Sequence, residues 1–259
     1  MFSKVLTYDK KLFRKIKIST IRALIKKYDQ YPKYSTFEVI SNNAGINLPI
    51  VLIAIFALNE DAGYLMLAMK TMQAPMALIG GSVAQVYFAH AAAKNKAGSL
   101  PEFTANTLKG LLKIGVGPII FAGIIAPQAF HLIFGSDWQR AGELVSWMAL
   151  WFALQFLTSP ISMVMHVKNK QKQMLTLTVT GFIIRVGSVI VAYYFYPNFI
   201  AEAYAISGGI FYFLCLIVYS FFGMSSLSPW WEILKSSKVI IALWCCSAVA
   251  VNFGLMWLQ

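Results

Sequence analysis

Long apolar runs separated by short polar breaks fill the chain from residue 36 onward. Seven of these runs have about 20 residues or more, the length that a helix needs to cross a bilayer. They span residues 36–58, 64–90, 108–134, 144–166, 174–195, 199–224 and 239–258. This pattern predicts an all-α fold, a polytopic membrane bundle of six to seven transmembrane helices.

Residues 1–35 show a different pattern. Apolar residues recur here at roughly helical spacing, and ten of the 22 lysines and arginines of the chain are interspersed among them. Such a basic amphipathic segment is expected to lie as a helix on the anionic face of a membrane. The alternative is a solvated basic linker that becomes ordered only within a larger protein.

The loops between the runs fall into two classes by charge. Every second loop is rich in lysine: Lys94, Lys96, Lys109 and Lys113, then Lys168, Lys170 and Lys172, then Lys235 and Lys238. The others carry Glu60 and Asp61, then Asp137, Arg140 and Glu143, then Asn198 and Glu202. By the positive-inside rule, the lysine-rich loops and the N-terminus are expected to be cytoplasmic. The expected organisation is a basic segment at 1–35, a six-helix transmembrane lobe at 36–224, and a cytoplasmic loop with a seventh helix at 225–259.

Composition agrees with a membrane protein. The chain is 58% hydrophobic and 12% charged, and its mean hydropathy is +0.64. The net charge of +12 is concentrated near the N-terminus, which favours a membrane surface over nucleic acid as the basic segment's partner. All three cysteines lie in apolar runs without histidine or carboxylate at metal-ligand spacing, so we predict no metal site and no cofactor.

One arginine lies inside an apolar run, in GFIIRVGSVI at residues 181–190. Arg185 is about 11 residues into its predicted span, or roughly 16 Å from the interface. Insertion of an arginine at that depth costs about 2.5–3.5 kcal/mol, and no acidic residue is predicted at the same depth. We therefore favour a water-filled cavity with an anionic guest. The alternative is a structural arginine bonded to backbone carbonyls and hydroxyls.

Three further polar residues lie inside predicted spans. Lys70 is about 6 residues inside its span, where its side chain either reaches the headgroups or lines a cavity. Asn43 and Asn47 are one helical turn apart and share a face, which is expected to meet another helix or a cavity. Interhelical hydrogen bonding is one interpretation of this pair, and contact with carbohydrate is the other.

Two stretches of the sequence resemble a known family. The first is KKYDQYPKYST followed by LPIVLIAIFALNEDAGYLMLAMKTMQAPMALIGGSVAQVYFAHAA, and the second is LIFGSDWQRAGELVSWMALWFALQFLTSPIS. Together they run from about residue 26 to residue 162. They are similar to the bacterial polysaccharide-export flippases that move lipid-linked O-antigen or capsule repeat units. That family belongs to the multidrug, oligosaccharidyl-lipid and polysaccharide exporter superfamily.

The resemblance implies a two-lobed bundle around a cationic cavity in the bacterial inner membrane, driven by a sodium or proton gradient. Arg185 and Lys70 would then attract the pyrophosphate of an undecaprenyl-linked oligosaccharide, and Asn43 and Asn47 would hydrogen-bond its glycan. The matched stretches resemble the C-terminal half of the family's members. The chain is therefore expected to be one lobe, which needs a separate N-terminal lobe or a second copy of itself to enclose a cavity.

The expected function is that of a flippase lobe in surface polysaccharide biosynthesis. We expect no enzymatic activity, because the sequence contains no nucleophile with a base and an orienting group, no phosphate-binding loop and no paired carboxylate site. One alternative is a membrane-embedded polysaccharide polymerase or ligase. Such an enzyme needs a sizeable outward loop with arginine or histidine near the substrate, whereas the predicted outward loops of this chain are short and contain Arg140 as their one cation. The other alternative is a non-transporting fragment or assembly partner.

Overall fold

The computed structural model describes residues 31–56 and 60–257, and every secondary-structure element in these residues is helical. Six helical segments are long and apolar enough to cross a membrane, or seven if a bent pair in α4 is included. The predicted all-α bundle of six to seven spans is thereby confirmed. The predicted interfacial helix falls almost wholly outside the described residues, which begin at residue 31.

Nine α-helices follow one another along the described chain. They are α3 (Thr36–Phe56), α4 (Asp61–Lys96), α5 (Leu100–Leu111), α6 (Gly117–Phe134), α7 (Gln139–Ile161), α8 (Val164–Val167), α9 (Gln171–Phe195), α10 (Ile200–Met224) and α11 (Pro229–Met256). A π-helical turn at Leu112–Val116 joins α5 to α6, so that the two form one span.

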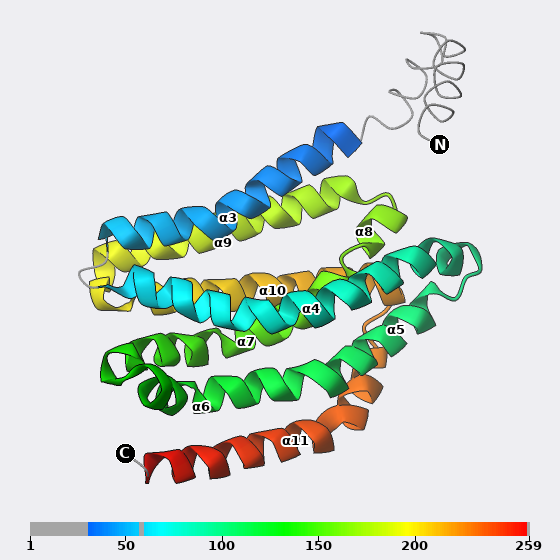
Figure 1. Cartoon of the computed structure of the whole chain (residues 1–259). Helices are drawn as coiled ribbons and strands as arrows, with labels where there is room; N and C mark the ends of the chain where they lie inside the picture. The colour runs from blue at the N-terminus through cyan, green and yellow to red at the C-terminus, as the bar shows by residue number, and fades with distance from the viewer. Residues whose placement is uncertain (1–30, 57–59, 258–259) are drawn as a thin grey trace, which may run out of the picture.

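The helices run up and down, and the connections gather at two ends of the bundle (Figure 1). One end holds the start of α3 and the connections α4–α5, α7–α9 and α10–α11, and we call it the basic end after the lysines there. The opposite end holds the connections α6–α7 and α9–α10, and we call it the acidic end after Asp61, Glu143 and Glu202. The alternation of loop charge along the sequence thus corresponds to two ends of the folded chain.

Several helices extend beyond their predicted runs, and α4 and α11 show the physical reasons. The helix α4 is bent by 51° between Asp61–Ala74 and Ile79–Lys96. The sequence between these segments contains Pro75, and proline cannot donate the helical hydrogen bond. The helix α11 begins at Pro229, so Lys235 and Lys238 lie in a helix and not in a loop. Lysine is a good helix former, and its long stem lets a membrane helix continue beyond the apolar run.

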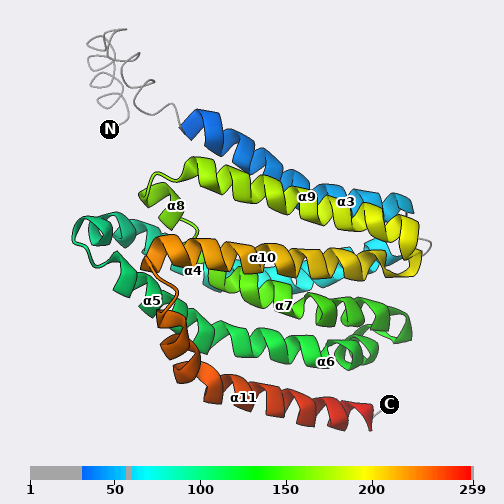
Figure 2. The same cartoon turned by 180° about the vertical axis from the view of Figure 1, so that it is seen from behind.

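The core of the bundle is organised around α7. This helix packs against α4, α6 and α10, while α3 packs mainly against α9, and α11 mainly against α6 (Figure 2). Of the most apolar stretch of each span, 61% is buried for α7 but only 6% for α11. The helices α3 and α11 therefore lie at the two edges of the bundle, and α7 is its central element.

The α6–α7 contact depends on small residues. A Cβ atom at Gly142 of α7 would overlap the backbone of Ala126 and Pro127 in α6, and a Cβ at Gly123 would overlap Ala149. The same contact carries a hydrogen bond, because Ser146 Oγ donates to the carbonyl oxygen of Gly123 at 2.6 Å. Close backbone approach of this kind is a principal source of helix association in membranes.

Gly142→Ala is expected to destabilise the protein. Alanine in place of glycine inside a helix normally stabilises by about 0.5–1 kcal/mol. Here the added methyl group meets backbone atoms that cannot rotate away, and overpacking of this kind costs about 1–3 kcal/mol. Gly187→Ala is the matched control, because a Cβ at Gly187 meets nothing within 4 Å. Thermal melting of both variants in detergent should place Gly142→Ala below the parent. A melting temperature equal to that of the control would contradict the packing described.

Candidate functional site

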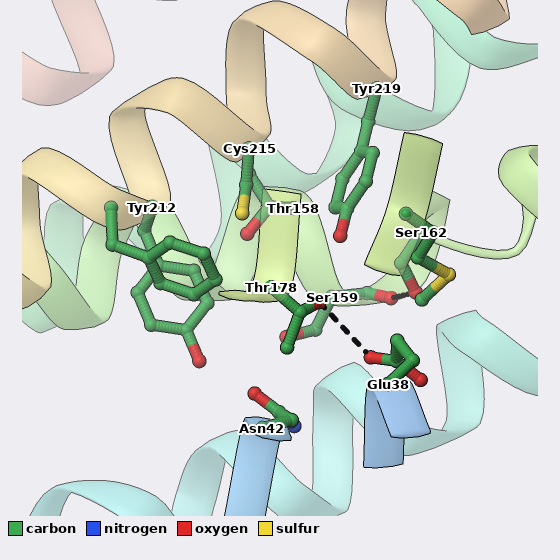
Figure 3. Close-up of a pocket in the computed structure, with 11 residues that line it drawn as sticks. Glu38, Asn42, Thr158, Ser159, Ser162, Thr178, Tyr212, Cys215 and Tyr219 are labelled. Atoms are coloured by element: carbon green, nitrogen blue, oxygen red, sulfur yellow. Dashed lines mark hydrogen bonds between the residues drawn. The ribbon is translucent and has the colours of Figure 1, made fainter. Parts of the chain in front are cut away.

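A small pocket opens near the basic end of the bundle, where α3, α7, α9 and α10 converge (Figure 3). Its volume is about 130 Å³. Most of the lining side chains are polar, and the complete lining is Glu38, Asn42, Thr158, Ser159, Ser162, Met174, Thr178, Phe211, Tyr212, Cys215 and Tyr219. Thr158, Thr178 and Ser162 donate hydrogen bonds within the protein, and the remaining polar groups of the lining can bind water or a polar guest.

Glu38 is the one acidic residue of this pocket. It lies in the first turn of α3, its exposed fraction is 9%, and Thr178 Oγ1 of α9 donates a hydrogen bond to its Oε1 at 3.3 Å. No lysine or arginine in the described part of the chain forms an ion pair with it. Asn42 lies one turn further along α3 and faces the same pocket. Glu38 is thus a buried carboxylate whose charge has no cationic partner among the described side chains.

A second, larger pocket lies between α4 and α7. It has a volume of about 310 Å³ and is lined by Gln73, Met76, Ala77, Gly80, Gly81, Ala84, Gln155, Phe156 and Ser159. Ser159 of α7 lines both pockets, so the two adjoin. We call the two pockets together the polar groove. The groove begins at the first turns of α3 and reaches the middle of α4.

One face of α7 supplies the polar side of the groove. Gln155, Ser159 and Ser162 follow one another at intervals of four and three residues, which places them on the same helical face. The Oε1 atom of Gln155 is buried and has no hydrogen-bond partner among the described residues. This polar stripe lies on the most buried helix of the bundle, where an apolar core would pack better.

Arg185 lies close to the groove but is closed off from it. Its exposed fraction is 0%. Its Nε donates to the carbonyl oxygen of Gly181 at 3.0 Å, and its Cζ lies 4.5 Å from the centre of the Phe211 ring. The same ring lines the small pocket, so Phe211 separates the guanidinium from the groove. On the α3 side, a Cβ at Gly45 would lie 2.6 Å from Nη2, so the guanidinium fits there because residue 45 is glycine.

The surroundings of Arg185 match neither sequence-based interpretation in full. The side chain is enclosed, and it does not line a cavity wall in this conformation. It also has too few partners for a purely structural arginine, because Nη1 and Nη2 are buried without a hydrogen-bond partner in the described residues. The predicted role in binding pyrophosphate therefore stays a prediction.

Lys70 is on the exposed side of α4 and does not contact Arg185. Lys70 precedes Gln73, Ala77 and Gly81 by three, seven and eleven residues. In a straight helix this spacing would place it on about the same face as these groove residues, although α4 is bent between Ala74 and Ile79. The ammonium group has no ion pair within the described residues. Its predicted place on a cavity wall fits this face, and its role in binding pyrophosphate stays a prediction.

Asn43 and Asn47 lie away from the groove. Both are exposed, whereas Gly45 and Pro49 of the same helix are buried against the bundle. Asn47 Nδ2 donates to the carbonyl oxygen of Asn43 at 2.9 Å, and neither side chain lines either pocket. It is their neighbour Asn42 that faces the polar groove. Contact of Asn43 and Asn47 with a glycan stays a prediction.

Sequence reasoning did not single out Glu38, Gln73 or Gln155 as site residues. A signal for Gln155 was present, because Gln155, Ser159 and Ser162 form a polar stripe at helical spacing within an apolar run. Glu38 was assigned to the end of a span, which is its position along α3, but its burial against α9 depends on tertiary packing. Gln73 alone in its run carries no periodic signal.

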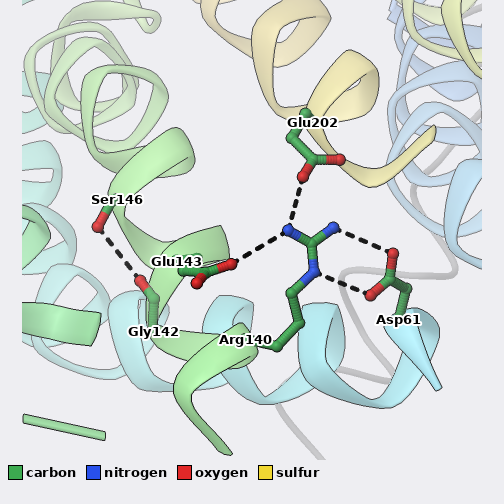
Figure 4. A network of polar contacts seen from close by, with 6 residues as sticks. All are labelled: Asp61, Arg140, Gly142, Glu143, Ser146 and Glu202. Atoms are coloured by element: carbon green, nitrogen blue, oxygen red, sulfur yellow. Dashed lines mark hydrogen bonds and ion pairs between the residues drawn. The ribbon is translucent and has the colours of Figure 1, made fainter. Parts of the chain in front are cut away.

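A second polar cluster is centred on Arg140 at the acidic end (Figure 4). The guanidinium lies 3.1 Å from Asp61 Oδ1 of α4 and 2.7 Å from Glu202 Oε1 of α10, and 3.4 Å from Glu143 Oε2 of its own helix, α7. Nη2 donates a second hydrogen bond to Asp61, to Oδ2, at 3.2 Å. Bidentate arginine–carboxylate contacts are geometrically specific. This cluster joins three helices at the acidic end, opposite the end near which the small pocket opens.

Hydration of the polar groove can be tested by cysteine labelling. In a background with Cys215, Cys245 and Cys246 replaced by alanine, Ser159→Cys is expected to react with a water-soluble maleimide, because the reactive thiolate forms only where water reaches it. Leu150→Cys is the control: Leu150 is on the opposite face of α7 and 65% exposed, on a surface that faces lipid if the bundle spans the bilayer. Equal labelling of the two positions, or labelling of Leu150→Cys alone, would contradict a hydrated groove.

Comparison with known proteins identifies a family. No curated protein and no solved structure matches the chain significantly. A family model described as polysaccharide biosynthesis protein matches residues 4–143, which is more than half of the chain. The match includes α3 to α6, and hence Glu38, Asn42 and Gln73 of the groove, but not Gln155 or Arg185. The chain therefore belongs to the polysaccharide biosynthesis protein family, which supports the resemblance to the polysaccharide flippases and exporters.

Proposed function

We propose that this protein is a flippase lobe that moves undecaprenyl-pyrophosphate-linked oligosaccharide repeat units across the bacterial inner membrane. The product would be a surface polysaccharide such as the O-antigen of lipopolysaccharide. The observation that carries the proposal is the polar groove, which places amide, hydroxyl and carboxylate groups within membrane-spanning helices of a polysaccharide biosynthesis protein. Polar groups inside a bilayer are costly and mark the path of a polar substrate.

The groove has the chemistry of a binding path and not of a catalytic centre. Its lining offers a single carboxylate, Glu38, and neither a histidine nor a lysine beside a hydroxyl nucleophile. A polymerase or ligase needs groups that activate a sugar hydroxyl or a leaving phosphate. The described connections at the acidic end, Gly135–Trp138 and Tyr196–Phe199, are also too short to build a separate catalytic loop. These features favour transport over the enzymatic alternative.

Arg185 and Lys70 are the cations that we assign to the pyrophosphate. A diphosphate that crosses a low-dielectric slab requires a countercharge. In the described conformation Gly45 and Phe211 cover Arg185, so the proposal requires α3 to separate from α9, or the Phe211 ring to rotate, before substrate reaches the guanidinium. The two partnerless guanidinium nitrogens are the donors that a phosphate would accept from.

A complete transporter also requires a partner surface and a driving ion. We propose that the exposed sides of α3 and α4 face a separate N-terminal lobe or a second copy of this chain, because a substrate cavity in such transporters lies between two repeats. The coupling ion would be sodium or a proton, and Glu38 is the groove carboxylate that would bind it. This assignment is tested by measuring transport of the lipid-linked oligosaccharide under a sodium gradient and under a proton gradient separately, in the parent and in Glu38→Gln. Equal gradient dependence in both would refute it.

The proposal is tested by export in a flippase-null strain. The full chain is expressed with and without a candidate N-terminal lobe, and surface polysaccharide is measured. We expect rescue when the lobe is present. Rescue by the chain alone would indicate that two copies form the transporter. Failure in both arms, with the protein present in the membrane, would favour a non-transporting fragment or assembly partner.

Arg185→Ala is expected to abolish export and to weaken binding of undecaprenyl pyrophosphate. Arg185→Lys should restore only part of the binding, because lysine keeps the charge but loses the bidentate fork. Thermal melting of Arg185→Met separates this role from a structural one, because methionine avoids most of the cavity that alanine would leave, and removal of a buried, poorly partnered cation should not lower the melting temperature. A lower melting temperature with unchanged lipid affinity would assign Arg185 to structure alone.

A further inference from the structure

We infer that the larger pocket of the polar groove, between α4 and α7, binds a sugar ring of the lipid-linked oligosaccharide through the amides of Gln73 and Gln155. This inference rests on the proposed function, because it assigns the glycan portion of that substrate to particular side chains. It places the glycan on α4 and α7, and not on the exposed face of α3 that carries Asn43 and Asn47.

The lining of this pocket is mostly apolar and carries no charge, and its polar side chains are Gln73, Gln155 and Ser159. Two amides and the Ser159 hydroxyl face it together with Met76 and Phe156, and no lysine, arginine, aspartate or glutamate lines it. A pocket without cations is a poor site for pyrophosphate. Primary amides donate and accept hydrogen bonds, as sugar hydroxyls do, and the apolar side chains suit the C–H faces of a sugar ring. The chemistry therefore selects a neutral, hydroxyl-rich ligand.

Gln155 provides a polar atom that needs such a ligand. Its Oε1 is buried and has no hydrogen-bond partner in the described residues. An unpaired buried acceptor is unfavourable, and rotation of the Gln155 amide toward the pocket would let a sugar hydroxyl donate to Oε1 and remove the penalty. Gln73 lies across the pocket on α4, on the N-terminal side of the 51° bend. A ring held between the two amides would contact both helices at once.

The pocket is large enough because two residues of α4 have no side chain. A Cβ at Gly81 meets nothing within 4 Å, and a Cβ at Gly80 comes only within 4.0 Å of Phe156. This differs from Gly142 and Gly208, where a Cβ would overlap a neighbouring helix. The glycines at 80 and 81 thus leave open space instead of allowing close packing. The volume of about 310 Å³ suits one sugar residue, not an extended glycan.

The test compares two lipids on the same protein. The full chain, in the assembly that supports export, is placed in nanodiscs, and its affinity is measured for undecaprenyl pyrophosphate with and without the oligosaccharide. Gln155→Leu and Gln73→Leu are expected to weaken binding of the glycosylated lipid about tenfold, as the loss of one or two hydrogen bonds implies. Gly81→Leu is expected to weaken the same binding because its side chain would fill the space that the sugar ring needs. Affinity for the bare lipid should stay unchanged.

Two substitutions serve as matched controls. Gln128 of α6 also has a buried, partnerless Oε1, and Gly187 of α9 also has open space at its Cβ position, but neither lines the groove. Gln128→Leu and Gly187→Leu are therefore expected to bind both lipids like the parent. Thermal melting of all five variants verifies that they are folded, and Gly81→Leu keeps the test valid should either glutamine variant unfold.

The outcomes separate this inference from the proposed function. If the parent binds both lipids equally, or if the groove variants bind the glycosylated lipid like the parent, the sugar site is refuted while the flippase proposal stands. Equal weakening of both lipids would refute it as well, because it would indicate a general structural effect. If the parent binds neither lipid, the proposed function and this inference fail together.

Discussion

Hydrocarbon solvates no polar group, and this constraint shapes each part of the bundle. Backbone groups are satisfied by continuous helices, so the described chain consists of helices joined by short connections. Polar side chains must also be satisfied inside the protein, either by hydrogen bonds to the backbone or by ion pairs. Ser146 bonds to the carbonyl of Gly123 across the α6–α7 contact, and Arg140 is surrounded by carboxylates. Against this background, several buried side-chain atoms have no partner among the described residues, and those of Gln155 and Arg185 lie at or beside the groove.

The polar groups in and beside the groove divide by charge, and this division supports the proposed substrate. A lipid-linked oligosaccharide has an anionic pyrophosphate and a neutral glycan. The protein offers cations at Arg185 and Lys70 and, separately, a groove segment with amides but no charge. The small pocket adds one carboxylate, Glu38, near the basic end. A ligand with one charged part and one neutral part matches such a distribution better than a uniformly charged or uniformly apolar ligand.

The all-α character and the six to seven membrane spans could be predicted from the sequence, since the length of an apolar run fixes whether a helix spans a bilayer. The start of α11 was predicted about ten residues late, because lysines at a helix end resemble a loop in a hydropathy pattern. The surroundings of Arg185 could not be predicted: Gly45 and Phe211 reach it from two other helices, and no periodic pattern connects them. The sequence does not show which face of a helix will line a groove and which will face lipid, because this depends on how the helices pack.

The Arg140 cluster has a mechanical consequence. It fastens α4, α7 and α10 to one another at the acidic end, whereas the groove separates α4 from α7 farther along. The pocket residue Ala77 is sixteen positions from Asp61, or roughly 24 Å along the helix. Rotation of α4 by about 10° around that fulcrum would change the groove width at Ala77 by roughly 4 Å. Side chains at the acidic end, outside the groove, would thus influence the groove's width.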